Sequence, residues 1–208
     1  DIICETKSLK SKPVSEDITL TNIKIDGTRW QIYEKAGKLK SVKDKKYQVK
    51  LAISDGEFRE SYLYCFFPTR VTLNTPYILH ATFELKPDRN DINEGDANKE
   101  VAKHLAQLII GVAKYLTSLK RKADWLPLKM LLVGLSNNIS LSKIKFNHWI
   151  NEALSNEAIY PCLDKTYRKI SKVTYVSDEF SKLIQDIGNE DVFPNMLLPN
   201  TINLWNYI

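Results

Sequence analysis

The chain has 208 residues, of which 43% are hydrophobic and 26% are charged, and its net charge is +5. This composition is that of an ordinary globular protein with enough apolar material for a core, so disulfides are not needed to hold the fold. The three cysteines, Cys4, Cys65 and Cys162, are far apart and odd in number. Cys65 lies in an apolar run and Cys162 follows a proline, so both are predicted to be buried thiols, and a reducing, cytoplasmic setting is expected. No apolar run is long enough to span a membrane.

The first half of the chain has the alternating pattern of β-strands. Apolar residues alternate roughly over residues 18–25, and Asp26-Gly27 then predicts a tight turn into a returning strand that begins at Trp30. Gly37 and the lysines around it predict the next turn. Residues 47–53 alternate cleanly and predict a further strand, and Asp55-Gly56 predicts the turn that ends it.

Two further strands are expected before the pattern changes. Residues 62–67 (YLYCFF) are apolar at nearly every position, which predicts one strand buried on both faces. After Pro68 and a loop, residues 77–83 predict another strand. Strands joined by short turns indicate a mostly antiparallel or mixed sheet.

The period changes near residue 96, where apolar residues begin to recur at spacings of three and four. Asp96 is expected to cap the helix, because its carboxylate can accept from the free amides of the first turn. The helix is predicted to end near Lys120. The apolar positions that define its buried face are Val101, Leu105, Leu108, Ile109, Val112 and Leu116.

The remaining residues have a mixed pattern. Residues 125–135 and 141–154 predict helices, and residues 160–163 predict a short extended link. Residues 173–176 predict a strand, and a last helix is expected from Asp178 to about Ile187. The predicted fold class is therefore α+β, with a sheet in the first half packed by the long helix and a smaller, mainly helical part after it. We expect residues 1–120 and 121–208 to form these two parts; the alternative is that they are continuous with each other.

Few residues have the spacing of a known catalytic or metal site. His80, His104 and His148 are isolated in the sequence, and we expect structural roles for them. No phosphate loop or nucleophile elbow is present. The acids Asp88, Asp91, Glu94 and Asp96 share one loop, where they favour either a helix start or a cation site.

Arg89 lies in the same loop, between a predicted buried strand and the long helix. A guanidinium at such a corner can point outward, and its planar fork matches phosphate oxygens. The alternative interpretation is a salt bridge to Asp88, Asp91 or a neighbouring acid.

The residues around Arg89 resemble one protein family. The segments that carry the resemblance are residues 64–70 (YCFFPTR), residues 76–92 (PYILHATFELKPDRNDI) and the helix that opens with Asn98-Lys99. They resemble the middle region of the ninety-kilodalton heat-shock chaperones and the sacsin-like proteins, within the GHKL ATPase superfamily. Chaperones of this family have an arginine followed three residues later by an aliphatic residue and then a polar amide, and Arg89, Ile92 and Asn93 match that spacing.

The resemblance implies a role shared with another domain. In the family, ATP and magnesium are bound by an N-terminal domain, and the middle-region arginine reaches the γ-phosphate when the two domains close. It implies that Arg89, assisted by Asn93, acts on that phosphate. Because the residues that bind ATP and magnesium in the family are not recognisable here, we expect no cofactor in this chain and no activity by itself. The chain opens without methionine and closes on an apolar run, and we expect it to be a segment of a longer polypeptide that includes the nucleotide-binding domain.

The sequence also fits two other classes of function. Lysines are concentrated between residues 35 and 50, and the patch Lys38, Lys40, Lys43, Lys45 and Lys46 predicts a surface for nucleic acid or an acidic protein. Alternatively, the chain is a scaffold on which Trp125, Trp149 or Trp205 meets a client or partner protein.

Overall fold

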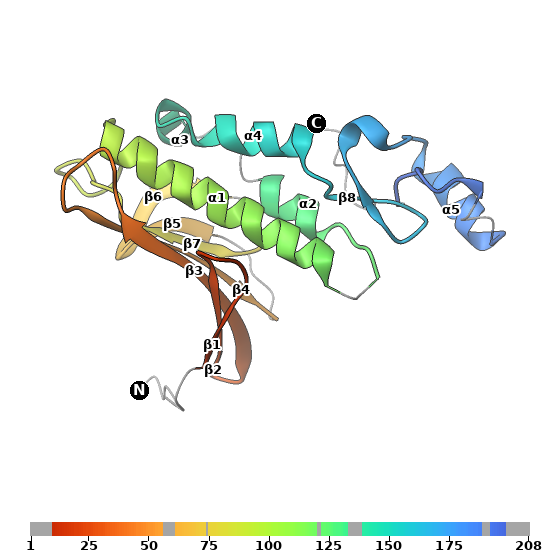
Figure 1. Cartoon of the computed structure of the whole chain (residues 1–208), viewed down its shortest axis with the longest axis horizontal. Helices are drawn as coiled ribbons and strands as arrows, with labels where there is room; N and C mark the ends of the chain where they lie inside the picture. Colours follow the sequence, from red (N-terminus) through yellow and green to blue (C-terminus); the bar gives the residue numbers. More distant parts are fainter. Residues whose placement is uncertain are drawn as a thin grey trace.

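The computed structural model of the chain describes residues 10–55, 61–73, 75–119, 122–132, 139–188 and 192–198. Its main feature is a mixed sheet of seven strands in the order β1-β2-β3-β4-β7-β5-β6 (Figure 1). β5 and β7 are parallel, and the other neighbouring pairs are antiparallel. The strands are β1 (Ser11–Pro13), β2 (Thr19–Ile25), β3 (Thr28–Lys38), β4 (Lys46–Ser54), β5 (Ser61–Cys65), β6 (Phe67–Leu73) and β7 (Ile78–Ala81). The predicted α+β class is confirmed.

The β2–β3 hairpin forms where the alternation predicted it. Asp26 and Gly27 both have positive φ, 47° and 82°, which gives the tight turn that matches the twist of two paired strands. The turn expected at Gly37 is wrong, because Gly37 lies inside β3 and pairs with Tyr47 of β4. A Cβ on Gly37 would lie 3.0 Å from Cε1 of Tyr47, so the glycine makes room for the ring. The chain reverses later, between Leu39 and Lys45.

The predicted single strand over residues 62–67 is also wrong. β5 ends at Cys65, and Phe66 has a φ of 63° and turns the chain directly into β6. Cys65 and Phe67 are opposite each other in the resulting hairpin. The continuous apolar run therefore contains a turn, and both phenylalanines are exposed rather than buried.

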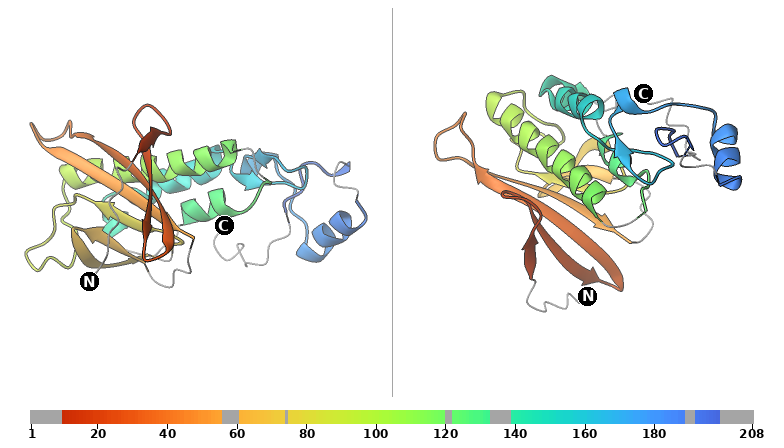
Figure 2. Two further views of the ribbon diagram at one scale, coloured as in Figure 1. Left: turned by 90° about the horizontal axis from the view of Figure 1, so that it is seen from below. Right: turned by 45° about the vertical axis from the view of Figure 1, so that its right-hand side comes forward.

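The long helix α1 (Asp96–Ser118) packs along the sheet. All six apolar positions that defined its predicted buried face are buried. The expected cap is not formed, because Asp96 is the first residue of the helix and the capping position is occupied by Gly95, which has no side chain to accept a hydrogen bond. The Asp96 carboxylate pairs with Lys99 at 3.0 Å. α1, α2 and α4 lie on one side of the sheet (Figures 1 and 2).

The chain beyond α1 is mostly helical. Its elements are α2 (Leu126–Leu131), α3 (Ile139–Lys143), α4 (Phe146–Asn156), β8 (Tyr160–Pro161), β9 (Tyr167–Arg168), the 3₁₀ turn η2 (Ile170–Lys172) and α5 (Asp178–Asp186). The single helix predicted over residues 141–154 is two helices, because Lys145 has a φ of 61° and breaks the ladder. The strand predicted over residues 173–176 is reduced to one bridge between Thr174 and Met196. The last helix is confirmed, and Ser177 caps it by accepting from the Phe180 amide at 3.3 Å.

One large hydrophobic core joins the two predicted parts. It contains sheet residues such as Leu51 and Leu79, α1 residues such as Leu105, and α4 residues such as Ile150. A small second cluster holds Leu163, Ile184 and Met196 near α5. None of the described helices combines the length and apolar character that a membrane span requires.

Candidate functional site

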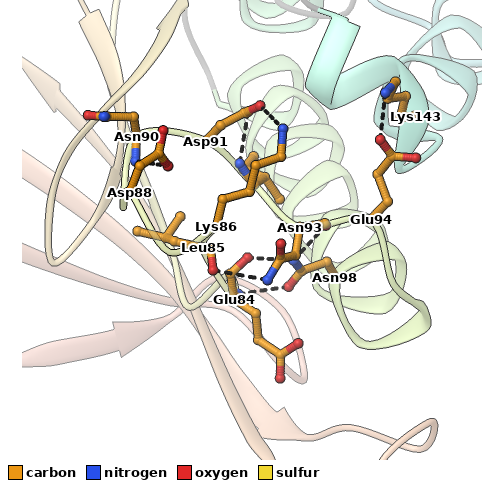
Figure 3. Close-up of polar contacts among 11 residues, drawn as sticks. Glu84, Leu85, Lys86, Asp88, Asn90, Asp91, Asn93, Glu94, Asn98 and Lys143 are labelled. Atoms are coloured by element: carbon orange, nitrogen blue, oxygen red, sulfur yellow. Dashed lines mark hydrogen bonds and ion pairs between the residues drawn. The ribbon is translucent and has the colours of Figure 1, made fainter.

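The Arg89 loop (residues 82–95) connects β7 to α1 and doubles back on itself (Figure 3). Leu85 and Ile92 form an antiparallel bridge. On either side of it, the Asn93 N–H donates to the Glu84 carbonyl at 3.0 Å and the Lys86 N–H donates to the Asp91 carbonyl at 2.8 Å. The loop is thus a small hairpin with a defined backbone.

Arg89 lies at the tip of this hairpin. Its N–H donates to the Lys86 carbonyl at 2.8 Å and closes a turn over Pro87 and Asp88, residue types that favour turns. Arg89 itself has a φ of 58°, in the left-handed region that glycine normally occupies after such a turn. A side chain there costs about 1–2 kcal/mol. The surrounding hydrogen bonds hold the arginine in this conformation.

Asn98, in the first turn of α1, fixes the base of the loop. Its Oδ1 accepts from the Glu84 N–H at 2.8 Å, and its Nδ2 donates to the carbonyls of Glu84 and Asn93 at 2.8 Å each. Only 1% of the Asn98 surface is exposed, so these bonds are shielded from water. This role of Asn98 was not predicted from the sequence, although an amide side chain near the start of a helix is a signal that can indicate such an anchor.

The acidic residues of the loop each have a separate partner. Asp91 pairs with Lys86 at 2.5 Å and Glu94 pairs with Lys143 of α3 at 2.5 Å. Burial works against the charge on Asp91, but hydrogen bonds from Lys86 and Ser140 bring its pKa below the ordinary value. The Asp88 carboxylate accepts from the Asn90 N–H at 3.1 Å. Within the described ranges, no group of three or more potential ligands is arranged to hold a metal ion.

The salt bridge considered for Arg89 is not formed. The acids that could pair with it are engaged as above, and the side chain is exposed. In the part of the chain that the structure describes, the Arg89 guanidinium has no hydrogen bond or ion pair. The Arg89 side chain is therefore exposed to solvent, while its backbone is held in place by the hydrogen bonds of the loop.

Asn93, the second predicted site residue, is turned toward the loop. Its Nδ2 donates to the Leu85 carbonyl at 2.9 Å, and its own carbonyl accepts from Asn98. These bonds give Asn93 a role in holding the hairpin. Its predicted assistance at a phosphate stays a prediction.

The edge strand β6 lies directly beside the tip. The Arg70 N–H donates to the Asn90 carbonyl at 2.9 Å, which ties the residue after Arg89 to the sheet. The Cys65 thiol at the end of β5 donates to the Phe83 carbonyl at 3.1 Å. The β5–β6 turn and the Arg89 loop thus lie at the same end of the sheet.

The predicted basic patch is only partly free. Lys45 pairs with Glu84, whereas Lys38, Lys40, Lys43 and Lys46 are exposed and have no side-chain partner among the described residues. Within the wider cluster, Lys35 is buried and pairs with Asp17 at 2.5 Å.

Glu100 of α1 holds the backbone of the turn between Leu39 and Lys45, which carries part of this basic patch. Its two oxygens accept from the N–H groups of Lys40 and Ser41 at 2.8 Å each. Burial would raise the pKa of Glu100, but hydrogen bonds from Ser41 and Lys40 outweigh it and lower the pKa to about 2. The turn is therefore anchored to the same helix as the Arg89 loop.

The three histidines have packing partners. The His104 ring stacks on Tyr47 with centroids 3.9 Å apart, and its pKa is lowered by burial and by Lys35. His80 meets the edge of Phe66, and burial lowers its pKa as well. His148 lies against Trp149. Of the predicted scaffold tryptophans, Trp125 and Trp149 are half-buried against the core, and Trp205 is outside the described residues.

Comparisons of this chain with protein-family models, with curated proteins and with solved structures find no match. Function is therefore inferred from the residues and their geometry.

Proposed function

We propose that the chain is the non-catalytic middle segment of a chaperone-like ATPase of the heat-shock and sacsin type. In this proposal, Arg89 reaches the γ-phosphate of ATP bound by a nucleotide-binding domain of the same polypeptide. The chain relays the closure of that domain and offers a platform for a client or partner protein. ATP and magnesium belong to the nucleotide-binding domain, and the setting is cytoplasmic, which suits the free thiols of Cys65 and Cys162.

The observation that carries the proposal is the contrast between Arg89 and its neighbours. The loop has a closed backbone and paired acids, while the arginine at its tip is exposed, unpaired among the described residues and held at a φ of 58°. Non-glycine residues in this region are uncommon, and strain of this kind concentrates at functional sites. A purely structural turn would be equally well served by glycine.

The chemistry fits an arginine that completes a site formed by two domains. Negative charge on the terminal phosphate oxygens is stabilised by a positioned guanidinium, and positioning keeps the cost of reorganisation low. The bonds from Asn98 to Glu84 and Asn93 supply that positioning from a long, well-packed helix. Asn93 is assigned the supporting role in the same loop.

ATP turnover by the full-length polypeptide tests the proposal. Arg89→Ala is expected to reduce turnover by roughly a hundredfold or more, as is found for arginine fingers generally. Arg29→Ala, at an exposed arginine on β3, is the matched control and should leave turnover unchanged. If Arg89→Ala turns over ATP at the rate of the unsubstituted protein, within error, the assignment of Arg89 to the γ-phosphate is wrong. The isolated chain should show no turnover.

A second candidate is nucleic-acid binding through Lys38, Lys40, Lys43 and Lys46, which are exposed together in and beside one turn. Such a surface should bind mixed oligonucleotides with an affinity that falls as salt rises, with a slope of about −0.9 per phosphate neutralised on duplex DNA. Changing the four lysines to glutamine should abolish this binding. No binding at low salt would dismiss the candidate.

A further inference from the structure

His104 lies one turn of α1 beyond Glu100, the residue that binds the turn at residues 39–45 (the 39–45 turn). The His104 Nε2 atom is 3.8 Å from the Glu100 Oε1 atom. That same oxygen accepts from the Lys40 N–H at 2.8 Å, while Oε2 accepts from the Ser41 N–H at 2.8 Å. One carboxylate therefore lies between an imidazole ring and the backbone of the 39–45 turn.

The hydrogen bonds of Gln107 define which ring nitrogen of His104 has the proton when the ring is neutral. Lys35 can only donate, and its Nζ lies 3.0 Å from the Gln107 Oε1 atom, so this atom of the amide is the oxygen. The His104 Nδ1 atom is 3.2 Å from the same oxygen and must also donate to it. Nε2 is therefore the unprotonated nitrogen, and it is the nitrogen nearer to the Glu100 carboxylate.

The groups around His104 hold the ring in place and oppose its protonation at neutral pH. The ring stacks on Tyr47 of β4 with centroids 3.9 Å apart and an interplanar angle of 4°. Burial raises the pKa of Tyr47, so that ring is uncharged. Burial and then the charge of Lys35, which is itself paired with Asp17 at 2.5 Å, lower the pKa of His104. Glu100, with a pKa of about 2, is the anion beside the ring.

Protonation of the His104 Nε2 atom turns its contact with Glu100 into an ion pair. A charge-assisted N–H···O bond is about 2.8 Å long, so the separation of 3.8 Å has to shorten by about 1 Å. The ring is held by its stack and its hydrogen bond, whereas the Glu100 side chain can rotate. A shift of that size takes its oxygens beyond hydrogen-bond distance of the Lys40 and Ser41 N–H groups.

We propose that the protonation state of His104 controls whether Glu100 binds the 39–45 turn. With a neutral ring, Glu100 binds the turn and fixes it to α1. With a protonated ring, Glu100 pairs with His104 and the backbone of the turn is released. Lys40 and Lys43 of the basic patch lie in this turn, so the arrangement of these exposed cations depends on pH. These contacts do not depend on either of the functions proposed above.

The pH range of the change follows from the two groups. His104 takes up its proton below the ordinary histidine pKa of about 6.5, because burial and Lys35 lower its pKa. Glu100 stays charged until the pH approaches its pKa of about 2. Because the unfolded chain takes up the proton first, the stability that neutral His104 contributes is present above about pH 6.5 and is lost as pH falls through the lower pKa of the folded state.

Amide hydrogen exchange tests the inference. The protection factors of the Lys40 and Ser41 amides are measured from about pH 8 to about pH 4.5, while the ring protons of His104 are followed by NMR to give its midpoint. Both protection factors are expected to fall several-fold with that midpoint as pH decreases. The Asn93 amide, which donates to the Glu84 carbonyl in the Arg89 loop, is the internal control and should keep its protection.

Substitution of the histidines identifies the residue responsible. His104→Phe keeps an aromatic ring on Tyr47 but takes up no proton, so the protection of the two amides in the 39–45 turn should be independent of pH. His80→Phe and His148→Phe replace the other two histidines of the chain and should leave the response of the turn unchanged.

Two results would overturn the inference. One is protection of the turn that stays constant or rises while His104 becomes protonated, and the other is a response to pH that persists in His104→Phe. If the melting temperature shows that His104→Phe does not fold, Glu100→Gln decides the matter. Glutamine has no charge to pair with the imidazolium, so protection should be lower at neutral pH and should not change with pH. A decrease that follows the histidine midpoint in Glu100→Gln would then contradict the role of Glu100 and overturn the inference.

Discussion

The Asn98 side chain binds both backbone groups of Glu84. Its Oδ1 accepts from the Glu84 N–H and its Nδ2 donates to the Glu84 carbonyl, each at 2.8 Å. The helix side chain thus occupies the place that a neighbouring strand would take beside residue 84. This relationship sets the start of the Arg89 loop relative to α1.

Asn98→Ala should therefore destabilise the protein and loosen the loop. Three buried hydrogen bonds are lost and backbone groups are left unpaired, so the free energy of unfolding should fall by roughly 2–4 kcal/mol. Urea denaturation measures this change, and faster hydrogen exchange at the Glu84 and Asn93 amides would locate it. Lys103→Ala, on the exposed side of the same helix, should change stability by less than about 0.5 kcal/mol. Equal effects of both substitutions would contradict the anchoring role.

Arg89→Gly should stabilise the isolated chain. Glycine removes the conformational cost of a side chain at φ 58°, but it also makes the unfolded chain more flexible, which is destabilising. The first effect is the larger, so the free energy of unfolding should rise by roughly 0.5–1 kcal/mol. The melting temperature should rise by about 1–4 °C. Gly27→Ala, at a φ of 82°, is the reverse control and should lower it. A lower melting temperature for Arg89→Gly would mean that the side chain contributes to packing.

Glu100 should make stability depend on pH in the acid range. Its pKa is lowered to about 2 in the folded protein, against about 4.3 in an unfolded chain. A group with a depressed folded pKa stabilises the fold above its unfolded pKa, and this contribution is lost as pH falls from about 4.3 toward about 2.

Comparison with Glu100→Gln isolates this contribution. At neutral pH the variant should be less stable by about 1–2 kcal/mol, because two charge-assisted bonds become neutral ones. The difference in urea midpoint should shrink as the pH approaches 2. Glu152→Gln, at an exposed glutamate on α4, should match the unsubstituted protein throughout. A difference that is constant with pH would show that the charge of Glu100 is not responsible.

Tyr77→Phe should weaken the contact between the sheet and α2. The buried Tyr77 hydroxyl donates at 2.5 Å to the Met130 carbonyl, which lies in the last turn of α2, where carbonyls have no partner within the helix. Its removal leaves that carbonyl unpaired, and should cost about 1–3 kcal/mol in thermal or chemical denaturation. Tyr64→Phe is the control, because its hydroxyl has no partner among the described residues. A loss no greater than that of the control would rule out the capping role.

Local patterns by themselves determined the regular elements. Period-two alternation placed β2, β3 and β4, and spacings of three and four placed α1 and its buried face, because each pattern follows from the geometry of one element. Asp26-Gly27 fixed the β2–β3 hairpin, since both positions require positive φ. The same patterns failed where the backbone turned without a glycine, at Phe66 and at Lys145.

The candidate site, too, was predicted from the sequence only in part. The sequence singled out Arg89, because a guanidinium at a strand-to-helix corner is a recognisable combination. Only the tertiary structure decided that Asp91 pairs with Lys86, that Glu94 pairs with Lys143 and that the Arg89 guanidinium has no partner among the described residues. Pairing depends on which side chains meet in space, and neither spacing nor composition encodes the choice between neighbouring acids. For the same reason, the anchoring by Asn98 and the closeness of Arg70 to the Arg89 loop emerged only from the fold.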